Sequence, residues 1–366
     1  MEFNSEMLVL AREYRELTQD ELAKKCGISR IKIAKIESGL TVPTDDEFSL
    51  LRAALNMPIA FFANLEPVVG YGSSAYFYRK KSDMTAAERK RIHSLVNIVR
   101  MGLKSMFKHV EVESERSMVR LPIEEYGGSA AKVARAVRAF WKLPEGPIKN
   151  LTTIVESAGI MVLLCKFGTR SMDATSIWLA DSPPMVFISD QIPGDRWRFT
   201  LAHELAHLVM HDLPHELMED EADAFAAEFL MPEVDMRAEF SRLGQIKLRD
   251  LAEMKLFWKT SMAAILKRAG DLGFLSENQS RYLWITMSKL GYRSKNVSSE
   301  PNPIPREAPS NANKLLKLFA QELKFSLEDL AAMMRIPAED VKTLFDASPW
   351  VDSSEPQRTP LRLVAG

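Results

Sequence analysis

The feature that most constrains this sequence is one amphipathic segment, Thr200 to His211, which carries histidines and a glutamate among apolar residues. His203 and His207 are four residues apart, so on a helix they lie about 40° from each other on one face, one turn apart. Two imidazoles at that spacing can bind one zinc ion. Glu204 lies beside them, where it could accept a proton from water that the metal binds. The segment therefore predicts a helix that supplies two zinc ligands and a general base.

The same five-residue pattern also occurs by chance in surface helices. Three features argue against chance here. The rest of the segment is apolar, which indicates burial. Buried histidine and glutamate side chains without partners would be costly. A second, acidic helical segment follows at Glu219 to Ala227.

The acidic segment offers the third ligand. A zinc site with two histidines needs a carboxylate from another segment, which leaves a fourth position for water. Glu219 and Asp223 share one helical face, and we predict Glu219 as the ligand. Asp223 would then hold the non-coordinating nitrogen of a ligand histidine, His203 in our prediction. Glu221 is the alternative ligand, although it points about 200° away from Glu219 around the helix.

Other polar residues lie near the motif. His211 continues the face of His207, and we expect it to be structural or to lie at the edge of the pocket. A metzincin site would need a histidine where Leu213 stands, so that class is excluded. Arg196, His211 and His215 are all candidates for stabilising an oxyanion, and the sequence does not choose between them.

The first 66 residues predict a helix-turn-helix domain of five short helices. Thr18 and Glu21 form a capping box that begins the second helix. Gly27 can adopt the left-handed conformation that ends it. Ser29 caps the third helix and Gly39 ends it.

The third helix has a core face and an outer face. Ile33 and Ile36 fall together and are expected in the core. The opposite side could enter a DNA major groove. The predicted DNA contacts are base contacts by Arg30 and Ile31, phosphate contacts by Lys32 and Lys35, and a contact from Gln19 at the start of the second helix.

The charge of this domain leaves an alternative open. Residues 1–66 contain eight Lys and Arg against eleven Asp and Glu, a net charge of −3. That counts against strong nonspecific DNA affinity. A domain used for dimerisation or for recruiting a protein therefore remains an alternative to DNA binding. A palindromic operator would require a homodimer.

The expected fold class is α+β: mainly helical, with a small antiparallel β-sheet. Short β-type runs occur at 160–164, 175–179 and 185–188, and their connections look too short for crossovers. We expect the run Met185 to Ile188 to be an edge that an extended substrate could join. The expected domains are a helix-turn-helix domain (1–66), a linker (67–84), the zinc domain (85–292), a second linker (293–310), a helix-turn-helix-like packing or partner element (311–347) and a flexible tail (348–366).

The 311–347 element weakly repeats the N-terminal pattern without its basic residues. Ala338, Asp340 and Thr343 stand where Arg30, Lys32 and Lys35 stand in the first copy. We therefore expect this element to pack or to bind a partner and not to read DNA.

Composition sets the remaining limits. The 366 residues have a formal net charge of −1 and 46% hydrophobic content, which is ordinary for a folded protein. No basic, apolar and small-residue leader is evident, and the apolar runs are too short to span a bilayer, so we expect a cytoplasmic protein without a membrane partner. Cys26 and Cys165 are expected to be buried free thiols.

Two stretches resemble known families. The run from Leu17 to Pro43 resembles the Xre family of phage-repressor-like domains. The run from Arg196 to Pro232 resembles the ImmA/IrrE family of metallopeptidases, with Ala206 where glycine is common. The second resemblance implies an intracellular zinc (Zn²⁺) peptidase that cleaves regulatory partners, with His203, His207 and Glu219 as ligands and Glu204 as the catalytic glutamate.

Together these patterns predict a DNA-binding transcriptional regulator with a zinc endopeptidase domain that cleaves a protein substrate, a repressor or toxin, or itself. One alternative is an antitoxin-like or purely DNA-binding regulator whose zinc is structural or sensory. Another is a protease whose helix-turn-helix recruits protein and has no DNA role. The intact Glu204 favours the first, because a structural zinc needs no general base.

Overall fold

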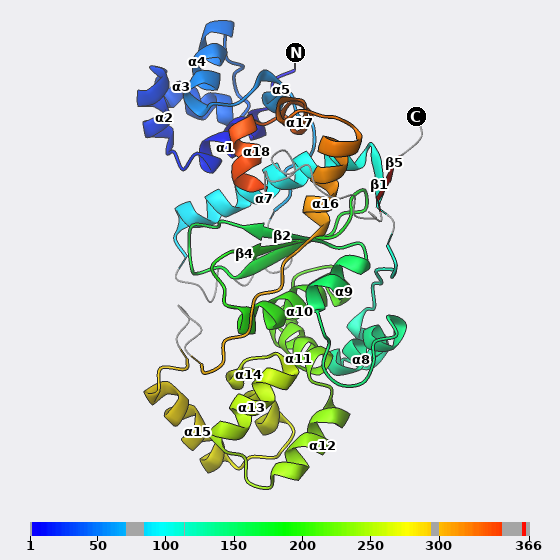
Figure 1. The fold of residues 1–366 in the computed structure, drawn as a ribbon. Helices are drawn as coiled ribbons and strands as arrows, with labels where there is room; N and C mark the ends of the chain where they lie inside the picture. Colours follow the sequence, from blue (N-terminus) through cyan, green and yellow to red (C-terminus); the bar gives the residue numbers. More distant parts are fainter. Residues whose placement is uncertain (1, 71–83, 113, 294–299, 346–360, 364–366) are drawn as a thin grey trace.

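The computed structural model describes residues 2–70, 84–112, 114–293, 300–345 and 361–363. Most of the first predicted linker, the first part of the second and most of the predicted tail lie outside these residues. The chain runs from a helical bundle at one end, through a small sheet, to a second helical body, and its C-terminal helices then return to the first end (Figure 1).

The N-terminal bundle has the five helices that the sequence predicts: α1 (Ser5–Tyr14), α2 (Gln19–Cys26), α3 (Arg30–Glu37), α4 (Asp45–Leu55) and α5 (Ile59–Phe62). The Thr18–Glu21 capping box begins α2, and Gly27 ends it at φ +74°. Ser29 accepts a hydrogen bond from the Lys32 backbone at the start of α3. The local start and stop signals of these helices are therefore confirmed.

The long helix α7 (Ala86–Phe107) lies under this bundle. Its buried side chains share one hydrophobic core with the bundle and with the C-terminal helices α16 (Asn311–Lys317), α17 (Leu327–Met334) and α18 (Ala338–Leu344). Gly102 allows α17 to approach closely, because a β-carbon at that position would lie 2.6 Å from Met334 Cε.

The C-terminal helices also contact the N-terminal bundle through a polar cluster. Arg15 donates two hydrogen bonds to Asp340, at 2.8 and 2.6 Å. Tyr14 donates a third to Asp340, at 3.3 Å. Asp340 is one of the residues that make the second helix-turn-helix copy unsuited to phosphate. In the structure it pairs with Arg15 of the N-terminal bundle. A short strand pair, β1 (Val110–Val112) with β5 (Leu361–Leu363), joins the segment after α7 to residues near the C-terminus.

The three-stranded sheet corrects the predicted topology. Its strands are β2 (Met161–Cys165), β3 (Ala174–Ile177) and β4 (Met185–Ser189), in the order β2-β4-β3. β3 and β4 are antiparallel as expected, but β2 and β4 are parallel, so the sheet is mixed. The prediction of an antiparallel sheet was wrong because β3 forms part of the β2–β4 connection, which makes that connection long enough for a crossover. The prediction that Met185 to Ile188 form an edge was also wrong, because β4 is the central strand.

Alternate residues of the sheet face two different cores. Leu163 and Phe187 pack with α7 and the bundle, whereas Val162 and Val186 pack with the second helical body. The sheet therefore lies between the two hydrophobic cores and contributes side chains to both.

The second helical body surrounds α10 (Gly194–Met210) and α11 (Met218–Leu230). Its other elements are η1 (Ile123–Tyr126), α8 (Ala130–Phe140), α9 (Leu151–Ser157), α12 (Glu233–Leu243), α13 (Leu248–Trp258), α14 (Met262–Asp271) and α15 (Glu277–Lys289). Trp197 and Trp258 are among the fully buried side chains of its core.

Residues 300–310 form a strap along this body before the chain enters α16. Glu300 accepts hydrogen bonds from the buried Lys255 amine at 2.8 Å and from the Met262 amide at the start of α14 at 2.9 Å. Glu307 accepts from Arg198 at 2.5 Å and from the Thr152 amide at 2.7 Å. Two carboxylates thus bind the strap to four helices, α9, α10, α13 and α14.

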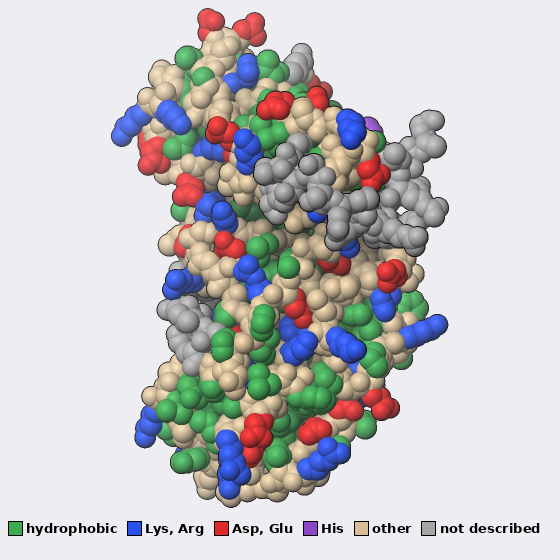
Figure 2. Space-filling model, viewed as in Figure 1, with side chains coloured by type: hydrophobic (Ala, Val, Ile, Leu, Met, Phe, Trp, Pro, Cys, Tyr) green, Lys and Arg blue, Asp and Glu red, His purple; other side chains and the backbone are tan. Residues whose placement is uncertain are grey.

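The helical α+β class is confirmed. Among the described residues, no helix combines the length and apolar character that crossing a membrane requires. Cys26 and Cys165 are buried free cysteines, as predicted. On the face drawn in Figure 2, hydrophobic side chains gather over the lower helical part of the molecule.

Candidate metal centre

The candidate centre lies between α10 and α11. α10 begins after Pro193 and is buried along most of its length, with Leu201, Ala202, Leu205 and Ala206 fully buried. Because these apolar residues hold one side of the helix against the core, the intervening polar positions are fixed towards α11. α11 is held in turn by buried Phe225 and Phe229.

Three predicted ligands come together. The Nε2 atoms of His203 and His207 are 3.1 Å apart. Glu219 Oε2 lies 3.4 Å from His203 Nε2, and Glu219 Oε1 lies 3.4 Å from His207 Nε2. Tetrahedral zinc with bonds of about 2.0–2.1 Å separates its ligand atoms by about 3.3 Å. The observed spacing matches that geometry.

The other nitrogen of each histidine has a partner. His203 Nδ1 lies 3.0 Å from Asp223 Oδ1, the pairing that the sequence analysis predicts. Lys267 of α14 lies 3.3 Å from the second Asp223 oxygen. His207 Nδ1 lies 2.9 Å from His211 Nδ1. These contacts orient both rings so that their Nε2 atoms face Glu219.

The protonation of the cluster follows from burial and from its neighbours. Burial disfavours charge on His203, but hydrogen bonds with Asp223 and Glu219 outweigh burial and raise its pKa to about 10. Burial lowers the pKa of His207 to about 4. Burial opposes ionisation of Glu219, but its hydrogen bonds with His203 and His207 hold its pKa well below the usual range. An ionised carboxylate therefore lies beside one neutral and one protonated imidazole, and a metal ion would displace the proton of His203.

Glu204 differs from Glu219 in its surroundings. It is 3% exposed, and burial raises the pKa of its carboxyl to about 7. Within the described part of the chain, Glu204 Oε2 is a buried atom without a hydrogen-bond partner, and the buried Glu219 Oε1 has only the 3.4 Å contact with His207. Buried carboxylate oxygens left in this state are costly unless a cation or water satisfies them. This donor set fits a divalent metal.

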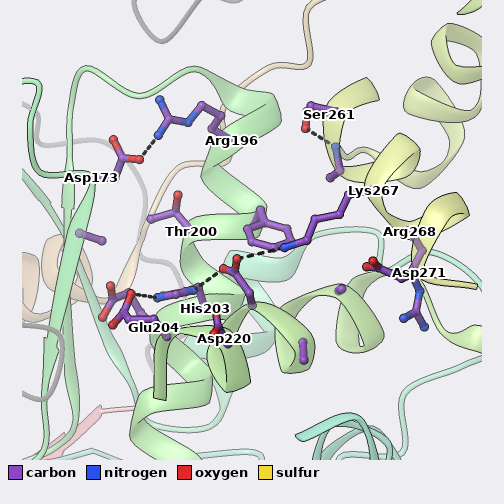
Figure 3. Close-up of a pocket in the computed structure, with 18 of the residues that line it drawn as sticks. Asp173, Arg196, Thr200, His203, Glu204, Asp220, Ser261, Lys267, Arg268 and Asp271 are labelled. Carbon is purple, nitrogen blue, oxygen red and sulfur yellow. Dashed lines mark hydrogen bonds and ion pairs between the residues drawn. The ribbon is translucent and has the colours of Figure 1, made fainter. Parts of the chain in front are cut away.

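A cleft of about 760 Å³ opens over these residues. It is lined by α10, α11, α14, α15 and the first part of β3, with His203, Glu204 and Glu219 in its wall. Figure 3 shows Arg196 and Asp173 paired on one side of the cleft and Lys267 extending from α14 on the other. Trp284 of α15 also lines it. An extended peptide segment could enter such a space.

The structure distinguishes the three residues that the sequence offered for stabilising an oxyanion. Arg196 lines the cleft and forms an ion pair with Asp173. His211 and His215 are absent from the cleft lining and lie beyond His207, where both contact Glu221. Glu221 is therefore a partner of these histidines and does not reach the His203–His207 pair.

Sequence reasoning missed Asp173 and Lys267 as residues of this site. Asp173 precedes β3 and Lys267 lies on α14, and neither belongs to a motif around the histidines. Only the tertiary packing of these elements brings them to the cleft.

The predicted DNA-contact residues differ in their exposure and in the partners of their side chains. Ile31 is 71% exposed, and Lys35 is also exposed. Arg30 is exposed and lies 3.6 Å from Asp20, while Lys32 lies 3.4 Å from Glu47. Gln19 donates a hydrogen bond to Glu37 at 2.8 Å, so its amide is turned towards the bundle.

Two segments of the chain match models of known protein families. Residues 10–62 match the helix-turn-helix family model. Residues 155–269 match the model of a peptidase family described as IrrE N-terminal-like domain. No curated protein matches the sequence. The chain thus joins a helix-turn-helix segment to a segment of a peptidase family, the combination predicted from its motifs.

Proposed function

We propose that this chain, which joins a helix-turn-helix segment to an IrrE-like peptidase segment, is a transcriptional regulator with a zinc-dependent endopeptidase activity against a regulatory protein or itself. The observation that carries the proposal is the meeting of three donor side chains, with contacts of 3.1–3.4 Å between them, beside a buried glutamate in the wall of a cleft. We assign His203, His207 and Glu219 as the ligands of the metal.

A zinc ion held there would supply a Lewis acid for the peptide carbonyl and would acidify a water molecule. Glu204 takes the proton of the attacking water and returns it to the leaving amine. Its pKa of about 7 suits both transfers, because the same carboxyl must accept and release a proton near neutral pH. Asp223 keeps His203 in the orientation and tautomer that a ligand needs.

The edge of the sheet nearest the centre suggests how a substrate would lie. β3 is an edge strand of the described sheet, and Asp173 and Ala174 at its start line the cleft. We propose β3, in place of β4, as the strand along which an extended substrate backbone lies. Arg196 is the remaining candidate for contacting the carbonyl oxygen as charge develops there.

The N-terminal bundle is assigned to operator DNA, with Arg30, Ile31, Lys32 and Lys35 on the outer side of α3 as its contacts. Gln19 would have to release Glu37 to join them. A regulator that binds an operator acts where the chromosome is, so we place it in the cytoplasm. We keep the homodimer as the expected form on a palindromic site. We propose the same domain boundaries that the sequence analysis predicts.

The matched pair Glu204→Gln and Glu253→Gln tests the catalytic assignment. Glu253 is an exposed residue of α13 outside the cleft. Each variant and the unaltered chain would be analysed for zinc and incubated with repressors encoded beside the gene, and fragments would be identified by mass spectrometry. Glu204→Gln should retain zinc and lose cleavage, and Glu253→Gln should retain both. Full activity in Glu204→Gln would refute the mechanism.

The same experiment addresses the alternative. A chain that holds zinc through His203, His207 and Glu219 but produces no fragments, from these repressors or from itself, would favour a structural or sensory zinc. The reading in which the bundle recruits a protein is supported by its net charge of −3. Absence of salt-dependent DNA binding by the full chain would favour that reading.

A further inference from the structure

A second cluster of metal-binding side chains lies at the end of α10, outside the cleft. It consists of His211, His215 and Glu221, whose ligand atoms all lie within 4.8 Å of one another. Glu221 Oε2 is 3.0 Å from His211 Nε2 and 3.4 Å from His215 Nε2. Two imidazoles and a carboxylate are the same donor set as in the His203–His207–Glu219 cluster.

The second cluster differs from the first in the exposure of one histidine, because His211 and Glu221 are about as buried as His207 and Glu219. The side chain of His215 is 42% exposed and that of Glu221 is 19% exposed, whereas that of His207 is 0% exposed. An ion could therefore reach His215 and Glu221 directly from solvent, and further coordination positions could be filled by water. His211 is buried and would bind through the Nε2 atom that faces Glu221.

The two clusters share one hydrogen bond, between His207 Nδ1 and His211 Nδ1 at 2.9 Å. A neutral imidazole has one N–H group and one nitrogen lone pair. If His207 binds a cation through Nε2, its Nδ1 carries the hydrogen and donates it to His211 Nδ1. His211 must then carry its own hydrogen on Nε2, where it donates to Glu221 and has no lone pair for a metal.

The reverse state has the opposite requirement. A cation on His211 Nε2 places the hydrogen of that ring on Nδ1, directly opposite the Nδ1 hydrogen of a metal-bound His207. Two N–H groups would then face each other at hydrogen-bond distance. Relief requires the rings to separate or one proton to leave to solvent, so occupation of one cluster opposes occupation of the other.

We propose that His211, His215 and Glu221 form a second divalent-cation site, of the zinc class, that competes with the first cluster through the hydrogen shared by His207 and His211. This proposal rests on the proposed function in one respect, because it takes the first cluster to be a metal site. Excess zinc would load the second site, weaken the first and lower peptidase activity.

Zinc titration calorimetry of the metal-free full chain tests the proposal. The unaltered chain should show one tight event and one weaker event. Glu221→Gln and His215→Asn should each weaken the second event by at least about tenfold, because each removes a ligand, and leave the first. His215 is substantially exposed, so its variant remains informative if Glu221→Gln fails to fold. His109→Asn is the matched control, since His109 is an exposed histidine that belongs to neither cluster.

Competition is tested with Glu219→Gln, which should lose the tight event and bind zinc at the second site at least about tenfold more tightly than the unaltered chain does. An unchanged affinity there would overturn the competition. A single event that is lost in Glu219→Gln and is unaffected by Glu221→Gln and His215→Asn would overturn the second site, and the proposed function would stand. Absence of any event in the unaltered chain would overturn both.

Discussion

Glu300 of the strap offers a sharp test of how the second helical body is held together. Lys255 is fully buried, and its amine donates hydrogen bonds to Asp195 at 2.9 Å and to Glu300 at 2.8 Å. Glu300 also accepts from the Met262 and Ala263 amides, at 2.9 and 3.2 Å, at the positive end of α14. One carboxylate therefore neutralises a buried cation and caps a helix.

The expected cost follows from these contacts. In Glu300→Ala, Lys255 keeps Asp195 but loses its second charged partner, and two helix amides lose their acceptor. Breaking a buried ion pair on one side costs about 3–5 kcal/mol. In Glu300→Gln one oxygen still accepts, but the charge is lost and an amide N–H group faces a donor, so we expect about 2–3 kcal/mol. Glu253→Gln, on the exposed side of α13, should change stability by less than about 0.5 kcal/mol.

Guanidinium unfolding of the full chain, followed by tryptophan fluorescence, measures these differences. Five of the six tryptophans lie between residues 141 and 284, so the signal reports on this half of the chain. The change in free energy is the midpoint shift multiplied by the slope m. A loss below about 1 kcal/mol for Glu300→Ala, or equal losses for Glu300→Ala and Glu253→Gln, would refute this account of the Lys255 cluster.

Three further predictions concern other parts of the molecule. In a double-mutant cycle, Arg15→Ala and Asp340→Ala should show a coupling of about 1–3 kcal/mol in unfolding free energy, and strict additivity would contradict the contact between the two ends of the chain. Cleavage should fall as the pH drops below about 7, because Glu204 must be ionised to accept a proton. Burial raises its pKa to about 7 without metal, and the bound cation lowers the midpoint from that value; a rate that stays level from pH 8 to 5 would argue against Glu204 as the base. Replacing Lys32 or Lys35 with alanine should reduce the slope of log K against log salt by about 1 for duplex DNA, measured by anisotropy, and an unchanged slope would exclude that residue from phosphate contact.

The local signals of the sequence predicted much of this structure. Helix starts depend on neighbours in the chain, so the capping box at Thr18 and the glycine at position 27 could be read directly. The first metal cluster could be read because His203 and His207 share one helix and Glu219 shares a face with Asp223 on the next. These relations need only the period of a helix.

Relations between distant segments could not be read in this way. The insertion of β4 between β2 and β3 depends on a crossover that connection lengths alone did not indicate. Lys267 lies on α14, and only the packing of that helix against the rest of the body brings it to Asp223. The role of Glu221 was also hidden, because its histidine partners come from the end of α10 and the loop after it.

The return of α17 and α18 to the first end of the molecule has a consequence for biosynthesis. Asp340 joins Tyr14 across 326 positions of the chain. A ribosome that adds about 5–20 residues per second needs roughly 15 to 65 s to make that interval. During this time the N-terminal bundle can fold, but the apolar face of α7 that α17 later covers stays open to chaperones or to other nascent chains. The last helices to be synthesised thus complete the first core to be made.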